Sequence, residues 1–341
     1  MHCVLSVFLS FLLIGAGLAA HGRAEEVETL VGTTMGTIYT IRLADVPAGT
    51  MAKTIQERID ERLAEFDLAM STYNPKSELS RFNLSTSDDW FCISPDTAKV
   101  VAFSLALAQQ TDGKFDPTVG PLVNLWGFGP AKKVRRPPTD EAIVEAQKDV
   151  GYRHLAVRLD PPALKKNIPG LYVDLSAVAP GYGVDVIAEL LERSGVMAFM
   201  IEIGGEVRIR GLKPDGSTWK IGIEDPDPTK TELKLIVPLE DESLATSGSY
   251  RNFFEFEGRK YSHTIDPSTG RPVEHQLATV TARAPTCMEA DAYATAVSVL
   301  GPEAGYDWAA KRGLAVLMVE RVEEAYRDRA TPAWTTALAK P

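Results

Sequence analysis

The stretch FDPTVGPLVNLWGFG, residues 115–129, is dense in glycine, proline and aromatic side chains. Glycine lets a backbone approach a ligand closely and an aromatic ring offers an apolar wall, so this composition suits a rigid ligand-binding loop. A buried, turn-rich connection has the same composition, and composition alone favours that alternative. The segments on either side are therefore needed to interpret the stretch.

The flanking segments carry the periodicity and the start and stop signals of helices and strands. Apolar residues three and four apart predict a helix over 50–70, and Ser94-Pro95 with Gly113 brackets the helix before the stretch. Further helices are predicted over 139–150, 180–194 and 287–300, and strands at 197–203, 207–210, 219–223, 233–239, 278–282 and 314–319. The pattern predicts a mixed α/β (α+β) fold with Pro-rich loops at 130–138 and 160–169 and a loose tail over 321–341.

Composition narrows the class of protein. The chain has 341 residues, is 45% apolar and 24% charged, and carries a formal net charge of −10. These values exclude a disordered chain, a collagen and a polytopic membrane protein. Nucleic-acid binding is not expected, because binding a phosphate backbone needs a dense basic patch. The basic clusters at 132–136 and 165–166 are short and are expected to lie in solvated loops.

The amino terminus has the pattern of a targeting segment. Residues 4–20, VLSVFLSFLLIGAGLAA, carry no charge, and small residues follow. We expect a signal peptide over residues 1–24, cleaved after Ala20 or Ala24, and a periplasmic protein; an uncleaved inner-membrane anchor is the alternative. After export Cys92 and Cys287 remain, either as one disulfide or as two buried thiols.

Three polar motifs are candidates for chemistry. Asp291 and Thr295 lie four apart on the predicted 287–300 helix, so their oxygens could bind a hard cation such as Mg²⁺; a solvent-facing polar pair is the alternative. Residues 174–183 run from a strand end into a helix start, whose free N–H groups suit phosphate. His263 stands beside Ser, Thr and Asp and is a candidate base or a structural histidine.

The order of the motifs along the chain is more specific than any one of them. The motifs are GTTMGT (32–37), MSTYNP (70–75), SE (77–78), residues 115–129, residues 174–182, GGE (204–206), ATSG (245–248), YSHTIDP (261–267) and ADAYATA (290–296). In this order, over about residues 32–301, they resemble the FAD:protein FMN transferase family, ApbE.

The resemblance implies a two-lobed flavin-transferase fold over residues 25–320, with FAD in a central cleft. Members cleave the FAD pyrophosphate with Mg²⁺, attach FMN by a phosphoester bond to a threonine or serine of an exported respiratory protein, and release AMP. Acceptors carry a Ser-Gly-Ala-Thr-like motif and belong to Nqr-type sodium-pumping or Rnf-type complexes or to nitrous-oxide-reductase maturation. An Mg²⁺-dependent FAD pyrophosphatase and a non-catalytic FAD-binding or delivery protein are the alternatives.

The resemblance also assigns residues. Catalytic roles fall to His263 and Asp291, and Mg²⁺ to Asp291, Thr295 and the carbonyl region of Ala177. The residues implied to bind the flavin nucleotide are Met35, Tyr73, Lys114, Phe115, Asp116, Asp174, Pro180 and Ile265. Two positions depart from the family pattern: many relatives carry Lys or Glu in place of Pro180, and Asn commonly replaces Glu202. Proline fits the first turn of a helix, so the backbone at 180 is expected to keep its course.

Overall fold

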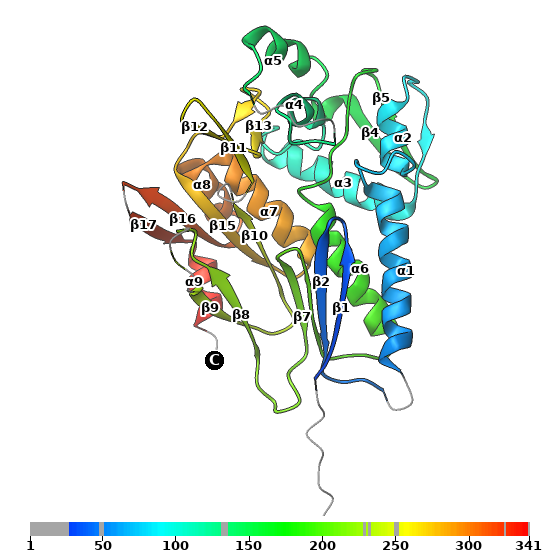
Figure 1. The fold of residues 1–341 in the computed structure, drawn as a ribbon, viewed down its shortest axis with the longest axis vertical. Helices are drawn as coiled ribbons and strands as arrows, with labels where there is room; N and C mark the ends of the chain where they lie inside the picture. The colour runs from blue at the N-terminus through cyan, green and yellow to red at the C-terminus, as the bar shows by residue number, and fades with distance from the viewer. Residues whose placement is uncertain are drawn as a thin grey trace, which may run out of the picture.

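The structure is a computed structural model that describes residues 27–47, 51–130, 136–227, 230, 233–248, 252–323 and 325–339 (Figure 1). The expected signal peptide, residues 1–24, and most of the basic cluster at 132–136 lie outside these residues. Within the described ranges, no helix combines the length and the apolarity that a membrane span requires.

One eight-stranded sheet organises the fold, and every neighbouring pair of its strands is antiparallel. The strands in spatial order are β1 (Glu28–Thr34), β2 (Thr37–Leu43), β6 (Phe199–Ile203), β7 (Glu206–Arg210), β10 (Ser243–Gly248), β15 (Leu277–Ala284), β16 (Ala315–Val322) and β17 (Ala325–Ala330). Alternate residues of a strand face opposite sides, so each strand contributes to two layers.

Helices cover one face of the sheet. They are α1 (Ala52–Met70), α6 (Ala179–Arg193), α7 (Cys287–Leu300) and α8 (Pro302–Lys311). The hairpin of β8 (Trp219–Glu224) and β9 (Leu233–Leu239), together with α9 (Pro332–Leu338), covers the opposite face. Both faces are therefore buried, which is why the central strands carry apolar residues on both sides.

Smaller elements gather at one end of the sheet, at the top of Figure 1. They are α2 (Glu78–Leu84), α3 (Pro95–Gln110), α4 (Gly120–Leu125), α5 (Asp140–Gln147), the 3₁₀ turn η1 (Tyr152–His154), the sheet β3 (Phe91–Cys92), β5 (Pro162–Lys166), β4 (Leu155–Leu159), and the hairpins β11 (Phe253–Phe256)/β12 (Arg259–Ser262) and β13 (Ile265–Asp266)/β14 (Arg271–Pro272). These elements supply the loops that surround the candidate site.

The predicted helices and strands are confirmed, with ends that move by a few residues. The helix predicted over 287–300 is α7 with the same bounds, because Thr286 caps its start and Gly301, at a φ of 82°, ends it. The stretch 115–129 is a loop only in part, since its middle forms α4.

The prediction of a loose tail over 321–341 is wrong for the described residues. Strand β17 pairs with β16, and α9 buries the Trp334 ring against the sheet. Three consecutive charged residues, Arg327, Asp328 and Arg329, lie in β17 at the sheet edge, so the sequence shows no apolar signal there.

One further prediction is corrected, and the state of the cysteines is decided. Lys166 was expected in a solvated loop but lies in β5 and is 1% exposed, because Nζ donates to the carbonyl oxygens of Asn83 (3.1 Å) and Leu171 (2.9 Å). Of the two alternatives for the cysteines, the disulfide is not formed, because both cysteines are free; the alternative of buried thiols holds for Cys287 but not for Cys92, which is exposed.

Candidate active site

Three adjoining pockets lie where the helix layer meets the loops at the end of the sheet. The first pocket, about 990 Å³, lies between the β1–β2 turn, α1 and the start of α6. The second, about 220 Å³, is bounded by the loop before α4 and by the 263–267 segment, and the third, about 620 Å³, runs along β7, β8 and β10 to α7. Ser176 lines all three pockets, so they meet at this residue.

Every residue that the family resemblance singled out as a site residue lines at least one of these pockets. Met35 and Pro180 line the first, Tyr73 the first and second, His263 and Thr295 the second and third, and Asp291 the third. The remaining residues line the second pocket: Lys114, Phe115, Asp116, Asp174, Ala177 and Ile265. The structure thus brings together residues that are up to 260 positions apart in the chain, from Met35 to Thr295.

Met35 reaches the first pocket from a tight hairpin turn. Met35 and Gly36 both have positive φ, 49° and 75°, which is the backbone of the turn that connects twisted antiparallel strands. Glycine adopts this conformation without strain, and the turn directs the methionine side chain toward Gly183 of α6.

The segment before α6 is fixed by main-chain and side-chain bonds. The Asp174 N–H donates to the Pro117 carbonyl at 2.8 Å, and the Asp174 carboxylate accepts the N–H (2.9 Å) and hydroxyl (2.5 Å) of Ser176. Pro180 lies in the first turn of α6, where no helical hydrogen bond is lost. The departure from the family pattern at 180 therefore leaves the helix start intact.

Helices α6 and α7 touch at Asp291. The Gly181 N–H donates to Asp291 Oδ2 at 3.0 Å, and a side chain at Gly181 would lie 2.4 Å from the Cys287 carbonyl oxygen. Asp185 of α6 pairs with Arg208 and accepts the Cys287 and Met288 N–H groups at 2.9 Å each. These bonds fix the start of α7 and with it the position of Asp291.

Asp291 lies in an acidic, buried environment. Burial raises the pKa of Asp291 above its ordinary value, and burial together with the negative charge of Asp291 raises the pKa of Glu206 on β7. Two carboxylates that disfavour each other's ionisation are stabilised by a shared cation.

The donor set fits Mg²⁺. Asp291 and Thr295 offer hard oxygen ligands one helical turn apart, and Ala177 lines the adjoining second pocket. Within the described ranges, no group of three or more His, Cys, Asp or Glu side chains could hold a metal ion. Side chains alone would leave the coordination shell incomplete, which suits Mg²⁺, because this ion keeps water and substrate phosphate among its ligands.

The hydrogen bonding of His263 leaves its Nε2 able to accept a proton. Its Nδ1 lies 3.1 Å from the Asn252 carbonyl oxygen, which can only accept, so Nδ1 carries the hydrogen and Nε2 is the free acceptor. Burial lowers the pKa of His263, which favours this neutral form near pH 7. Phe128 packs edge-to-face against the imidazole, with the two ring centroids 6.3 Å apart, and limits the movement of the imidazole.

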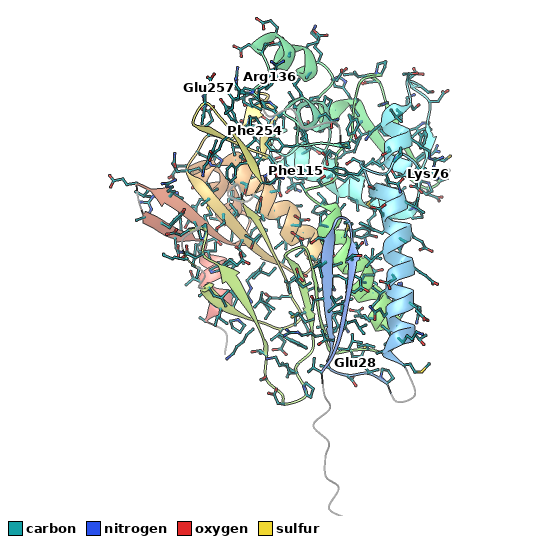
Figure 2. All side chains as sticks on the ribbon, in the orientation of Figure 1. Glu28, Lys76, Phe115, Arg136, Phe254 and Glu257 are labelled. Atoms are coloured by element: carbon teal, nitrogen blue, oxygen red, sulfur yellow. The ribbon has the colours of Figure 1, made fainter. Side chains whose placement is uncertain are left out.

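The second pocket shows different uses for its predicted residues. Phe115 is buried toward the middle of the molecule, whereas Lys76 and Glu257 lie at its periphery (Figure 2). The Asp116 carboxylate accepts from Thr118 N and Oγ1 and from Tyr152 N, at 2.6–2.8 Å, so its oxygens hold the loop in shape. Lys114 Nζ donates to the carboxylate of Asp266 at 2.8 Å.

Several pocket residues carry no role in the sequence analysis. Phe128, Glu206 and Ser247 occur in the motifs quoted there, but nothing local marked them for a function. Asn252 lies outside every motif and is recognisable only from its contact with His263. These side chains become relevant through tertiary contacts that sequence spacing does not reveal.

The comparisons with known proteins agree with this arrangement. A family model described as the ApbE family matches residues 35–318. A curated Vibrio cholerae protein named FAD:protein FMN transferase is 43% identical and aligned over 98% of both chains; the Escherichia coli K12 protein of the same name is 39% identical over 94% of this chain and 91% of its own.

Solved structures show the same similarity. The flavin transferase ApbE from Vibrio cholerae has a TM-score of 0.85 at 42% identity, covering 91% of this chain and 99% of its own. The apo flavinyl transferase ApbE from Pseudomonas stutzeri has a TM-score of 0.85 at 37% identity, covering 93% and 98%. The predicted resemblance and the mixed α/β flavin-transferase fold are confirmed. With a matching family model over most of its length and such relatives over nearly all of it, the chain belongs to the ApbE family.

Proposed function

We propose that this protein is an exported, Mg²⁺-dependent FAD:protein FMN transferase. The observation that carries the proposal is the meeting of three pockets at Ser176, the third of which is lined by Asp291, Thr295 and His263 together. The first and second pockets offer apolar walls for the ring systems of FAD, and the third leads to the metal-binding side chains. The names of the relatives support the same reaction.

The groups in the site match the demands of phosphoryl transfer, which needs positioning and charge neutralisation more than covalent chemistry. Bound by Asp291, Thr295 and the Ala177 carbonyl, Mg²⁺ would neutralise the charge that develops on the FAD pyrophosphate. The free N–H groups expected at the start of α6 are not found: the Ala179 and Tyr182 N–H groups donate to main-chain carbonyls, and the Gly181 N–H donates to Asp291. Neutralisation of the phosphate charge therefore falls to the metal.

His263 supplies the base. Its Nε2 takes the proton of an acceptor serine or threonine hydroxyl, and that oxygen forms a bond to the phosphorus on the FMN side of the pyrophosphate. The bond from this phosphorus to the bridging oxygen breaks, and the electron pair leaves with AMP. The products are a phosphoester-linked FMN protein, AMP and a protonated imidazole.

The compartment and the acceptor belong to the same proposal. The uncharged run at residues 4–20 supports export to the periplasm. We propose as acceptor an exported domain with a Ser-Gly-Ala-Thr-like motif, from an Nqr-type or Rnf-type complex or from nitrous-oxide-reductase maturation. Fusion of residues 1–24 to alkaline phosphatase tests export: we expect periplasmic activity, and its loss when Leu12→Arg interrupts the apolar run.

One incubation separates the three functions that the sequence left open. Purified protein is mixed with FAD, Mg²⁺ and an acceptor domain, and the intact mass of the acceptor and the free nucleotides are measured. A mass gain of one FMN that EDTA prevents supports transfer. Free FMN and AMP without that gain would identify a pyrophosphatase, and unchanged FAD would identify a binding protein.

A further inference from the structure

Strands β7 and β10 share only a short contact in the middle of the sheet. Their register contains two pairs, Ser243 with Arg208 and Leu244 with Val207. Strand β7 begins only at Glu206, because the chain turns at Gly204-Gly205, both with positive φ. Strand β10 continues past this point to Gly248. We call the space beside Thr246 and Gly248, beyond the end of β7, the β10 notch.

The main chain of β10 is open toward the notch. The Ile209 N–H donates to the Glu242 carbonyl, so the N–H and C=O groups of residue 242 and of every second residue after it face the β7 side. Thr246 and Gly248 continue this series past the last β7 pair. Among the described residues no strand pairs with them on that edge, although β15 pairs with them on the other. Such an edge is a template for an added strand.

The third pocket follows the β10 notch. It is lined on one face of the sheet by β8, including Ile221, and it reaches Asp291 and Thr295 on the other face. A methyl group built on Gly205 would meet no atom within 4 Å, so the side of the notch formed by the β6–β7 turn is open. The space therefore connects the surface under the β8–β9 hairpin with the metal-binding side chains.

A buried hydroxyl without a partner lines the same space. Thr279 on β15 is 3% exposed, and within the described part of the chain its Oγ1 has no hydrogen-bond partner. Thr279 lies one strand away from the open edge and pairs with Gly248, which has no side chain to separate the hydroxyl from the pocket that both residues line. A buried unpaired hydroxyl costs free energy that a bound ligand would recover.

We infer that an extended segment of the acceptor polypeptide adds to β10 at the β10 notch, antiparallel to β10 and continuing the line of β7; the inference rests on the proposed function. Main-chain groups spaced as in a strand recognise a polypeptide rather than a small molecule. Side chains of an added strand alternate, as those of β10 do: Ala245 packs against α7 and Leu244 against the β8–β9 side. Every second acceptor side chain thus points toward α7, where a hydroxyl reaches Asp291 and Thr295.

The test measures acceptor binding apart from transfer. The probe is an acceptor domain with Ser-Gly-Ala-Thr in which alanine replaces the threonine, so that it binds without reacting. Thr279→Val keeps the shape of the side chain and removes the hydroxyl; we expect it to weaken probe binding about tenfold, the effect of one lost hydrogen bond in a buried site. FAD affinity should not change. Ser243→Ala is the matched control, because Ser243 also has a buried hydroxyl without a partner in the described chain but does not line the pocket.

Two further measurements guard against misfolding and against failure of the activity itself. Ile221→Trp fills the pocket from β8 and should weaken the probe, whereas Ile236→Trp, on the exposed face of β9, should not. Hydrogen exchange of residues 243–248 should slow when the probe is added. Probe binding with this protection but no FMN transfer to the threonine form would refute the proposed function and leave the docking intact. FMN transfer with unchanged probe affinity in Thr279→Val and Ile221→Trp would overturn the docking and leave the function intact.

Discussion

Asn83 on α2 holds the segment that carries Asp174, Ser176 and Ala177, and its replacement tests how far the site depends on this support. The side chain is 8% exposed; Nδ2 donates to the Val173 carbonyl and Oδ1 accepts the Val173 N–H, both at 2.8 Å. In Asn83→Ala both main-chain groups of Val173 lose their partner in a buried place. Each orphaned group costs about 1–3 kcal/mol, so we expect a loss of about 2–6 kcal/mol. This is a large share of the 5–15 kcal/mol that typically stabilises a domain, roughly a third to a half.

The functional effect follows from the neighbouring bonds. Val173 precedes Asp174, whose N–H is bonded to the Pro117 carbonyl, and this pair joins the segment to the loop of the second pocket. Without Asn83, the segment that carries Asp174 is no longer ordered in the free protein and must become ordered when FAD binds. The free-energy cost of this ordering should weaken FAD affinity by about tenfold. Stability is measured by urea unfolding, and FAD affinity by quenching of flavin fluorescence at a temperature where every variant is folded.

Thr331→Val is the control for loss of stability alone. Thr331 is fully buried; its Oγ1 donates to the Leu314 carbonyl at 2.6 Å and accepts the Val316 N–H at 3.0 Å. It lines none of the three pockets. We expect a similar loss of unfolding free energy without any change in FAD affinity. If Asn83→Ala lost stability but bound FAD as tightly as the wild type, the support would be irrelevant to the site and the reasoning would be wrong.

Three further outcomes are expected. His263→Gln should slow FMN transfer by about 10²–10⁴-fold with unchanged FAD affinity. The active imidazole is neutral and burial lowers its pKa, so wild-type kcat/KM should fall only as pH drops below about 6.5. This decrease at acid pH should be absent in the variant. Asp291→Asn should abolish the response to Mg²⁺ and lower the rate about a thousandfold, seen as AMP release, since a metal stabilises the transition state by several kcal/mol. Trp334→Ala should lower the free energy of unfolding by about 3–5 kcal/mol in a denaturant titration. Trp90→Ala is the comparison: this ring is 41% exposed and contacts Arg158, so the loss should be clearly smaller.

Local signals in the sequence are sufficient to predict the two helices, α6 and α7, that carry part of the site. Capping residues and glycines delimit α7, and a proline opens α6, because these residues act within one turn of the helix they bound. Strand β17 was missed because it is an edge strand with charged side chains. Lys166 was misplaced because the carbonyl oxygens that bind its ammonium group come from Asn83 and Leu171, which periodicity does not connect with it.

The family resemblance selects residues that line three adjoining pockets of the structure, but the sequence does not reveal the contacts that set their chemistry. The influence of Asp291 on Glu206 crosses from α7 to β7, and the orientation of His263 depends on Asn252, eleven residues earlier. Such contacts are products of the tertiary fold. The sequence therefore indicates which residues meet, whereas the structure gives the charge and the hydrogen-bond direction of each.

The arrangement of the pockets also bears on the order of events. Thr246, Gly248 and Thr279 beside the β10 notch line the third pocket and neither of the other two, so FAD in the first and second pockets leaves the notch free for a polypeptide. Both substrates can then be present together, and the hydroxyl can attack the FAD pyrophosphate directly. We expect double-reciprocal plots for FAD at several acceptor concentrations to intersect. Parallel lines, or a stoichiometric burst of AMP before acceptor is added, would mean that FMN is first held covalently by the enzyme, and direct attack would be refuted.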